Sequence, residues 1–224
     1  VGEGESVRQG DLERSASAFE EKTYPNITQA LGTEWSPGID DDPHLNILSA
    51  GLRGVGGYYT SGDEHPAEVF PFSNEREIVY VNTSPPSVGT SGYDRTLAHE
   101  FQHAVHWNSD PSEETWINEG LSELAVTIAG YGQDLVGLFL SGTPTSLVNW
   151  PLSQGISRAH YGASSLFMHY FYEHYSTSGG LKPLLANPKD GIIGIDSYLA
   201  ASGFTVIFRD IFGDWVVANL LDES

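Results

Sequence analysis

The segment REIVYVNTS at positions 76–84 has the clearest strand pattern, with Ile78, Tyr80 and Asn82 alternating against Val79, Val81 and Thr83. A period of two places successive side chains on opposite faces, so this stretch predicts a β-strand. The apolar run at 44–51 predicts a second strand, and the glycine-rich segment at 56–62 predicts an edge strand. A helical period in residues 15–32 predicts one helix ahead of these strands, with a disturbance near its proline.

Helical periodicity dominates the chain from Asp94 onward, and Asp94 itself is expected to cap the first of these helices. A loop is predicted at 141–160. The helices are expected at about 94–107, 114–128, 161–175, 191–202 and 205–222. Because the strands precede residue 85 and the helices follow residue 94, the pattern indicates an α+β fold.

The chain length of 224 residues suits one domain with two lobes. We expect residues 1–108 to form a sheet lobe that also carries the first helix after the strands. Residues 109–224 are then expected to form a mainly helical lobe. No apolar run approaches the length that would span a membrane.

The amino-acid composition limits the possible binding partners, nucleophiles and metal ligands of the chain. The chain has 30 acidic and 10 basic residues, a formal charge of −20, which makes nucleic acid a poor partner. It contains no cysteine, so thiolate ligands, cysteine nucleophiles and disulfides are excluded. A zinc ion could be held only by histidine, aspartate or glutamate.

The segment LAHEFQHAVHW, residues 97–107, contains the strongest candidate chemistry. On a helix, His99 and His103 lie one turn apart on one face, opposite an apolar face. Two imidazoles at this spacing can bind one zinc ion, and Glu100 can serve as general base toward an activated water. The role of His106 on the same face stays open between a supporting residue and an ordinary exposed histidine.

A third zinc ligand is expected from the next helix, ETWINEGLSELAV. Glu119 and Glu123 fall one turn apart on its polar side. One carboxylate could bind the metal while the other accepts a hydrogen bond from a ligand imidazole. Spacing alone permits Glu123 as the ligand, because Glu119 follows His103 after only fifteen intervening residues.

These motifs resemble those of gluzincin zinc metallopeptidases of the thermolysin type. HEFQH followed by NEGLSE is similar to the thermolysin-like pattern, and WINEG is similar to the W-L-N-E-G of gluzincin aminopeptidases. Across residues 95–222 the chain looks most like secreted bacterial hyicolysin-like and immune inhibitor A-like peptidases. The resemblance implies a thermolysin-like zincin fold, a zinc cofactor, a peptide or protein substrate and an extracytoplasmic location.

The resemblance also assigns roles. It makes Glu119 the third zinc ligand and Glu123 the partner of a ligand histidine, although the thermolysin-like pattern has aspartate at that second position. It makes Tyr161 the donor to the oxyanion, with His160 as a further candidate, both expected just before the third helix. In gluzincins an edge strand also binds the peptide by strand addition, and 56–62 is the candidate here.

The absence of a G-x-M-E-N signature favours an endopeptidase over an aminopeptidase. Two alternative functions remain open. The chain could be a zincin-fold binding or adhesion module without catalytic turnover, or a zinc hydrolase of a non-peptide substrate. Ca²⁺ is a further candidate cofactor. However, the acidic runs at 40–43 and 61–66 lack the spacing of a calcium loop and are expected to be solvated turns.

Overall fold

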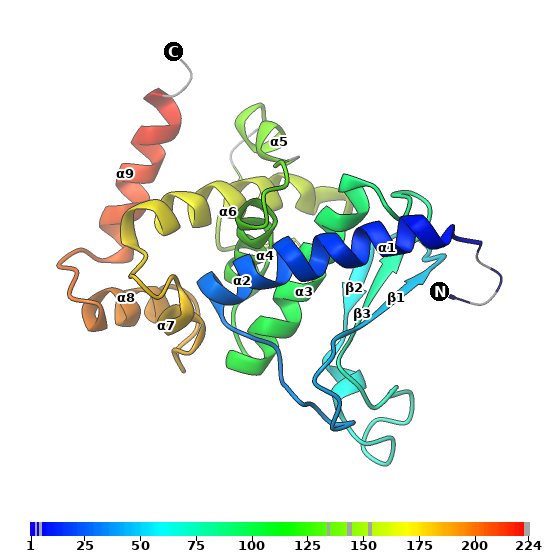
Figure 1. The fold of residues 1–224 in the computed structure, drawn as a ribbon. Coiled ribbons are helices and arrows are strands. Elements are labelled where there is room, and N and C mark those ends of the chain that lie inside the picture. Colours follow the sequence, from blue (N-terminus) through cyan, green and yellow to red (C-terminus); the bar gives the residue numbers. More distant parts are fainter. Residues whose placement is uncertain (3, 5, 134, 143–144, 152–153, 222–224) are drawn as a thin grey trace. The chain divides into compact units, whose positions relative to one another are not determined.

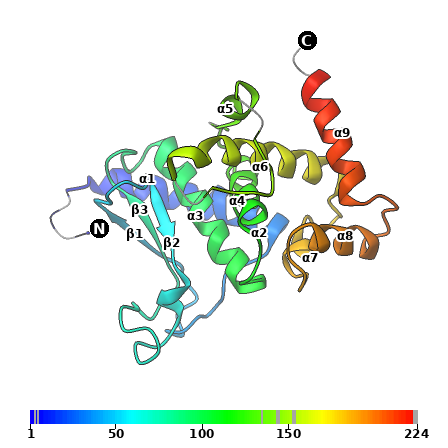
Figure 2. The ribbon, with the colours of Figure 1, turned by 180° about the vertical axis from the view of Figure 1, so that it is seen from behind.

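A computed structural model describes the chain except for residues 3, 5, 134, 143–144, 152–153 and 222–224. The fold is α+β and mostly helical, with one small mixed sheet, as predicted, and it is compatible with a zincin (Figures 1 and 2). The chain divides into two compact units. One comprises residues 1–109 and 125–132, and the other comprises residues 110–124 and 133–224.

The first unit opens with a long helical segment. It consists of α1 (Gln9–Ala18), a π-helical turn (Phe19–Thr23) and α2 (Tyr24–Leu31). The helix expected at 15–32 therefore begins six residues earlier. The π-helical turn ends two residues before Pro25, whose missing backbone N–H explains why the regular helical pattern is interrupted there.

The sheet of the first unit has three short strands, β1 (Asn46–Ala50), β2 (Gly57–Tyr59) and β3 (Ile78–Asn82). Their order is β1-β3-β2, with β1 parallel and β2 antiparallel to β3. Every residue of β3 is buried, as its central place requires. The segment 56–62 contains β2, so the expected edge strand is confirmed.

The two acidic runs of the first unit differ in exposure. Residues 40–43 are exposed, as expected for a solvated turn. Residues 61–66 contain the short 3-10 helix Ser61–Glu64, in which Glu64 is only 5% exposed. The Glu64 Oε1 atom accepts a hydrogen bond of 2.7 Å from the Tyr59 hydroxyl group. The prediction of a solvated turn is therefore wrong for the second run, because a tyrosine of the sheet provides a partner for the buried carboxylate.

Helix α3 (Ser91–Ser109) packs against β3 and β2. The Ser49 and Tyr93 hydroxyl groups lie 2.6 Å apart and join β1 to this helix. The prediction that Asp94 caps α3 is wrong, because the helix begins three residues earlier at Ser91. Asp94 is buried instead, and its Oδ1 accepts a hydrogen bond from Ser15 Oγ at 2.6 Å. A carboxylate that bonds to a neighbouring helix is hard to distinguish from a cap in sequence alone.

Helix α4 (Thr115–Ile128) contributes to both units. The second unit is otherwise built from α5 (Val136–Leu140), α6 (Gln154–Tyr175), α7 (Lys182–Leu185), α8 (Gly191–Ala201) and α9 (Phe208–Leu221). Its core contains a group of buried aromatic rings in edge and tilted contact: Trp116, Phe167, Phe208 and Trp215. Over the described residues, no helix is long and apolar enough to cross a membrane.

Helix α6 begins earlier than predicted, so the loop expected at 141–160 is shorter. His160 and Tyr161 therefore lie within α6 and not just before it. Pro151 is the last proline before the helix. Every residue from 152 to 160 has a backbone N–H, so no proline prevents the helix from beginning before His160.

Glu113, two residues before α4, is a titratable group whose carboxylate is partly buried and hydrogen-bonded. Its Oε1 accepts hydrogen bonds from the backbone N–H groups of Gly191 at 2.8 Å and Glu114 at 2.6 Å. Burial raises the pKa of Glu113 to about 7, and the charges of Asp110 and Asp190 act in the same direction, against the effect of the two hydrogen bonds. The folded state therefore binds a proton here that the unfolded chain releases at lower pH.

We predict that replacing Glu113 by Gln flattens the pH dependence of stability. Since the folded pKa lies above the ordinary value of 4.5, the free energy of unfolding falls as pH rises from about 4.5 to about 7. Glu113→Gln keeps an oxygen acceptor and cannot ionise, so this fall should shrink by about 1–2 kcal/mol after allowance for solvent screening. Urea unfolding at about pH 5 and about pH 8 measures the effect. The exposed Glu13→Gln variant is the control, and equal slopes in all three proteins would contradict the prediction.

Candidate metal centre

The two histidines of the HEFQH segment lie one turn apart on α3. Their ring centroids are 5.0 Å apart, with an angle of 80° between the ring planes. The opposite face of the helix is fully buried through Leu97, Phe101 and Val105. Because that apolar face is fixed in the core of the first unit, His99 and His103 are held on the other side of the helix.

Glu119 lies on α4, which is anchored by a buried apolar face. Trp116, Ile117 and Leu121 are almost completely inaccessible to solvent. The Trp116 indole N–H also donates a hydrogen bond of 2.7 Å to Glu114 Oε2. These contacts fix the rotation of α4 about its axis and thereby the direction in which Glu119 projects.

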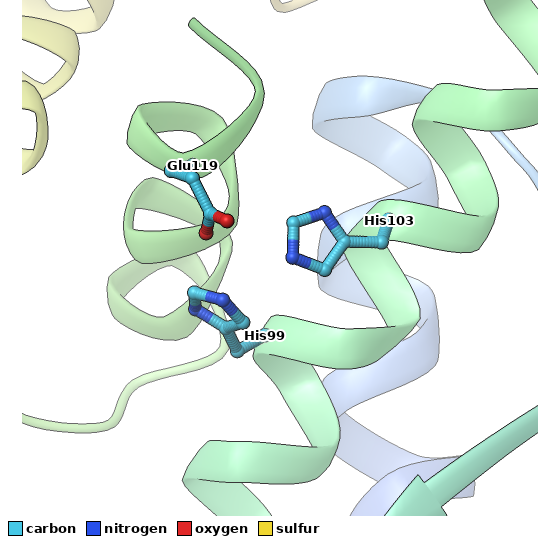
Figure 3. A group of neighbouring side chains, drawn as sticks. All are labelled: His99, His103 and Glu119. Atoms are coloured by element: carbon cyan, nitrogen blue, oxygen red, sulfur yellow. The ribbon is translucent and has the colours of Figure 1, made fainter. Parts of the chain in front are cut away.

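The donor atoms of His99, His103 and Glu119 lie within 4.8 Å of one another, and all three residues are partly buried. Figure 3 shows the three side chains pointing toward one another, from α3 and α4. Two imidazoles and one carboxylate form a donor set that suits catalytic zinc, which takes three protein ligands and keeps one position open. Among the described side chains, Glu123 is not a member of this group.

Glu100 follows His99 directly and is buried, with 7% of its surface exposed. The backbone of β2 passes close to it. A Cβ atom added to Gly57 would come within 2.9 Å of Glu100 Cγ and 2.8 Å of the Tyr80 carbonyl oxygen. Only glycine therefore fits at this point of the edge strand, and the strand backbone covers the stem of the glutamate.

Glu123 is buried on α4 and lies close enough to His169 of α6 for its charge to act on that imidazole. Burial lowers the pKa of His169, while a hydrogen bond to the Ser165 carbonyl and the charges of Glu173 and Glu123 oppose the shift. His169 is a residue that the sequence did not single out, because nothing marks it within an aromatic-rich helix.

His160 and Tyr161 are adjacent residues of α6, and both contact Trp150. The ring centroids of Trp150 and Tyr161 are 4.8 Å apart, and those of Trp150 and His160 are 5.8 Å apart. The His160 Nδ1 atom is buried and has no hydrogen-bond partner among the described residues. Trp150 thus restricts the orientation of both candidate donors.

His106 is buried, with 1% of its surface exposed, so its interpretation as an exposed histidine is wrong. The Gln102 side-chain nitrogen lies 3.4 Å from His106 Nδ1. A helix bearing histidines every three or four residues can bury the last of them where it meets other parts of the fold. The local pattern does not show this.

Comparison with known proteins gives one distant likeness. Over 123 residues the chain is 29% identical to the neutral metalloprotease ShpI of Staphylococcus hyicus. The match covers 46% of this chain and 27% of the length of that relative. No protein-family model matches the chain. The likeness therefore connects part of this chain with part of a metalloprotease.

The close approach of β2 to Glu100 generates a prediction about stability. Gly57→Ala should lower the free energy of unfolding by about 1–3 kcal/mol, because the new methyl group overlaps the Glu100 stem and the Tyr80 carbonyl oxygen. Gly56→Ala is the matched control, since its Cβ would meet only the Thr96 side chain at 3.7 Å. Chemical denaturation of both variants measures the difference. Equal losses at the two positions would show that Gly57 has no special steric role.

Proposed function

We propose that the chain is the catalytic part of a zinc-dependent metallopeptidase that acts as an endopeptidase. The observation that carries the proposal is the convergence of His99, His103 and Glu119, with Glu100 directly after the first histidine. The likeness to a metalloprotease supports the same class of reaction. Since the chain matches only about a quarter of that relative, the activity and substrates of any longer protein are part of the proposal.

His99, His103 and Glu119 are the residues that would hold the metal, and Glu123 would orient a ligand imidazole. The bound Zn²⁺ would supply a Lewis acid that activates water and polarises the scissile carbonyl. Glu119 is preferred to Glu123 as the ligand because the donor group includes the first carboxylate and, among the described side chains, omits the second.

Glu100 is the proposed general base. It accepts a proton from the attacking water and delivers it to the leaving amine as the peptide bond breaks. Its burial beneath the backbone of β2 restricts its motion and limits competing solvent, which favours directed proton transfer. A carboxylate next to two potential metal ligands is the expected position for this role.

Tyr161, with His160 as a second candidate, is proposed to donate a hydrogen bond to the developing oxyanion. Their contacts with Trp150 support a restricted orientation. The substrate peptide is proposed to align along β2, which is an antiparallel edge strand with the glutamate under its first residue. The proposed setting is extracytoplasmic.

Replacement of the base provides the direct test of function. In the zinc-loaded protein, Glu100→Gln should reduce casein hydrolysis by roughly 10²–10⁴-fold, because the amide cannot accept the proton. Zinc content and melting temperature should stay near those of the wild type, and the exposed Glu13→Gln variant should remain active. Full zinc occupancy without cleavage in the wild type would instead favour a binding module or a hydrolase of a non-peptide substrate.

Metal analysis separates the two candidate carboxylate ligands. Glu119→Ala should weaken zinc binding strongly, since one of three ligands is lost, whereas Glu123→Ala should weaken it by roughly 10–100-fold, as expected for an orienting partner. Competition with a chromogenic chelator measures both affinities without relying on activity. The reverse order of effects would reassign the ligand to Glu123.

A further inference from the structure

A pocket of about 450 Å³ lies in the first unit. One wall is the helical segment from α1 to α2, and the other is the chain from Pro43 to Ile47, which includes the start of β1. None of the residues proposed for zinc binding or catalysis lines this pocket. Its volume suits a small molecule or one long side chain of a peptide.

Aromatic and aliphatic side chains form much of the pocket wall. Phe19 and Tyr24 line the helical side, with their ring centroids 5.9 Å apart in edge-to-face contact. Both rings also contact the buried ring of Phe101 on α3, at 5.2 and 5.3 Å, which restricts their orientation. Leu45 and Ile47 line the opposite side. These surfaces suit the hydrocarbon part of a ligand.

Glu34, which follows α2, is the buried carboxylate of this pocket. Its side chain is 3% exposed, and its Oε2 atom has no hydrogen-bond partner among the described residues. Tyr24, which also lines the pocket, shares a hydrogen bond with this carboxylate. The carboxyl group therefore lies beside the Tyr24 hydroxyl group at the pocket wall. A donor that enters the pocket has an acceptor there that the described part of the chain leaves unsatisfied.

The charges around the pocket favour a cation. Among the described residues, no lysine or arginine lines it, and no ion pair involves Glu34. Glu20 is a second, exposed carboxylate of the pocket, and the His44 imidazole on the other wall contacts Asp42. Burial raises the pKa of Glu34, hydrogen bonds oppose the rise, and the charge of Glu77 adds to it. A positive charge in the pocket would offset the cost of burying the ionised carboxylate.

We propose that this pocket binds a primary ammonium group carried on an apolar stem, as in a lysine side chain. The ammonium group would donate a charge-assisted hydrogen bond to Glu34, and the stem would lie between the aromatic and aliphatic walls. An inorganic cation would leave those walls without a partner, and a neutral apolar ligand would leave the Glu34 oxygen unsatisfied. The chemistry is shared by a lysine of a polypeptide and by a free alkylamine.

The test is a titration of the zinc-loaded, isotope-labelled protein with N-acetyl-lysine amide, followed by protein NMR at about pH 8, where the probe is charged. Saturable shifts are expected in the backbone signals of residues 16–24 and 43–47, with a Kd on the order of 1 mM for a probe of this size. N-acetyl-norleucine amide, which lacks the ammonium group, should bind roughly tenfold more weakly or not at all. All titrations are made at constant ionic strength. The readout is binding, so its outcome is independent of the proposed peptidase activity.

Two variants separate the Glu34 charge from the general negative charge of the protein. Glu34→Gln should weaken binding of the lysine probe by roughly tenfold or more, because a charge-assisted hydrogen bond becomes a neutral one. Glu21→Gln is the matched control, since this exposed residue is next to Glu20 but does not line the pocket. It should bind like the wild type. Without a ligand, Glu34→Gln should melt no lower than the wild type, because the amide keeps an oxygen acceptor and removes a buried charge.

A third variant tests the pocket without changing its charge. Ala16 is exposed and lines the pocket, so Ala16→Phe should narrow it and weaken binding while the helix stays folded. Binding of n-pentylamine distinguishes the two sources of the ammonium group. Equal affinity indicates a free amine and weaker affinity indicates a polypeptide lysine, and either result supports the site.

Three results would overturn the proposal. The first is the absence of saturable shifts up to about 20 mM probe, well above the expected Kd. The second is equal affinity for the lysine and norleucine amides, or unchanged affinity in folded Glu34→Gln. The third is a set of shifts confined to residues 97–123, which would place the probe at the candidate metal centre.

Discussion

The burial of one face of α3 is the constraint on which the candidate site depends. Leu97, Phe101 and Val105 have almost no solvent exposure, and each would lose about 1.5–3 kcal/mol of transfer free energy if the helix turned them outward. A helix held this firmly on one side has no freedom of rotation. The imidazoles of His99 and His103 are therefore placed by hydrophobic packing before any metal contributes to their orientation.

The edge of the sheet adds a second level of positioning. The antiparallel strand β2 meets α3 where Gly57 leaves room for the stem of Glu100. A side chain at that position would displace either the strand or the glutamate. Strand β2 thus lies at the edge of the sheet and packs against α3, the helix that carries the histidines. Its backbone at Gly57 also restricts the buried side chain of Glu100.

The sequence predicted the structure best where side chains follow the period of a strand or of a helix. The strand pattern at 76–84 predicted β3, and the amphipathic pattern at 97–107 predicted which face of α3 is apolar. The pattern failed where a polar residue has a distant partner. Asp94 looked like a helix cap because its bond to Ser15 joins residues 79 positions apart. For His106 the pattern left both a supporting role and an exposed position open, and tertiary packing, which buries the ring, excludes the second.

Acidic residues show most clearly that sequence does not reveal the tertiary surroundings of a polar side chain. The chain's charge of −20 gives no indication of which carboxylates are buried. The backbone N–H groups that surround Glu113 offset part of the cost of its burial. The Glu34 and Glu77 carboxylates each keep an oxygen that no donor reaches among the described residues. A fold retains buried charge of this kind at a net cost unless protons or a cation neutralise it.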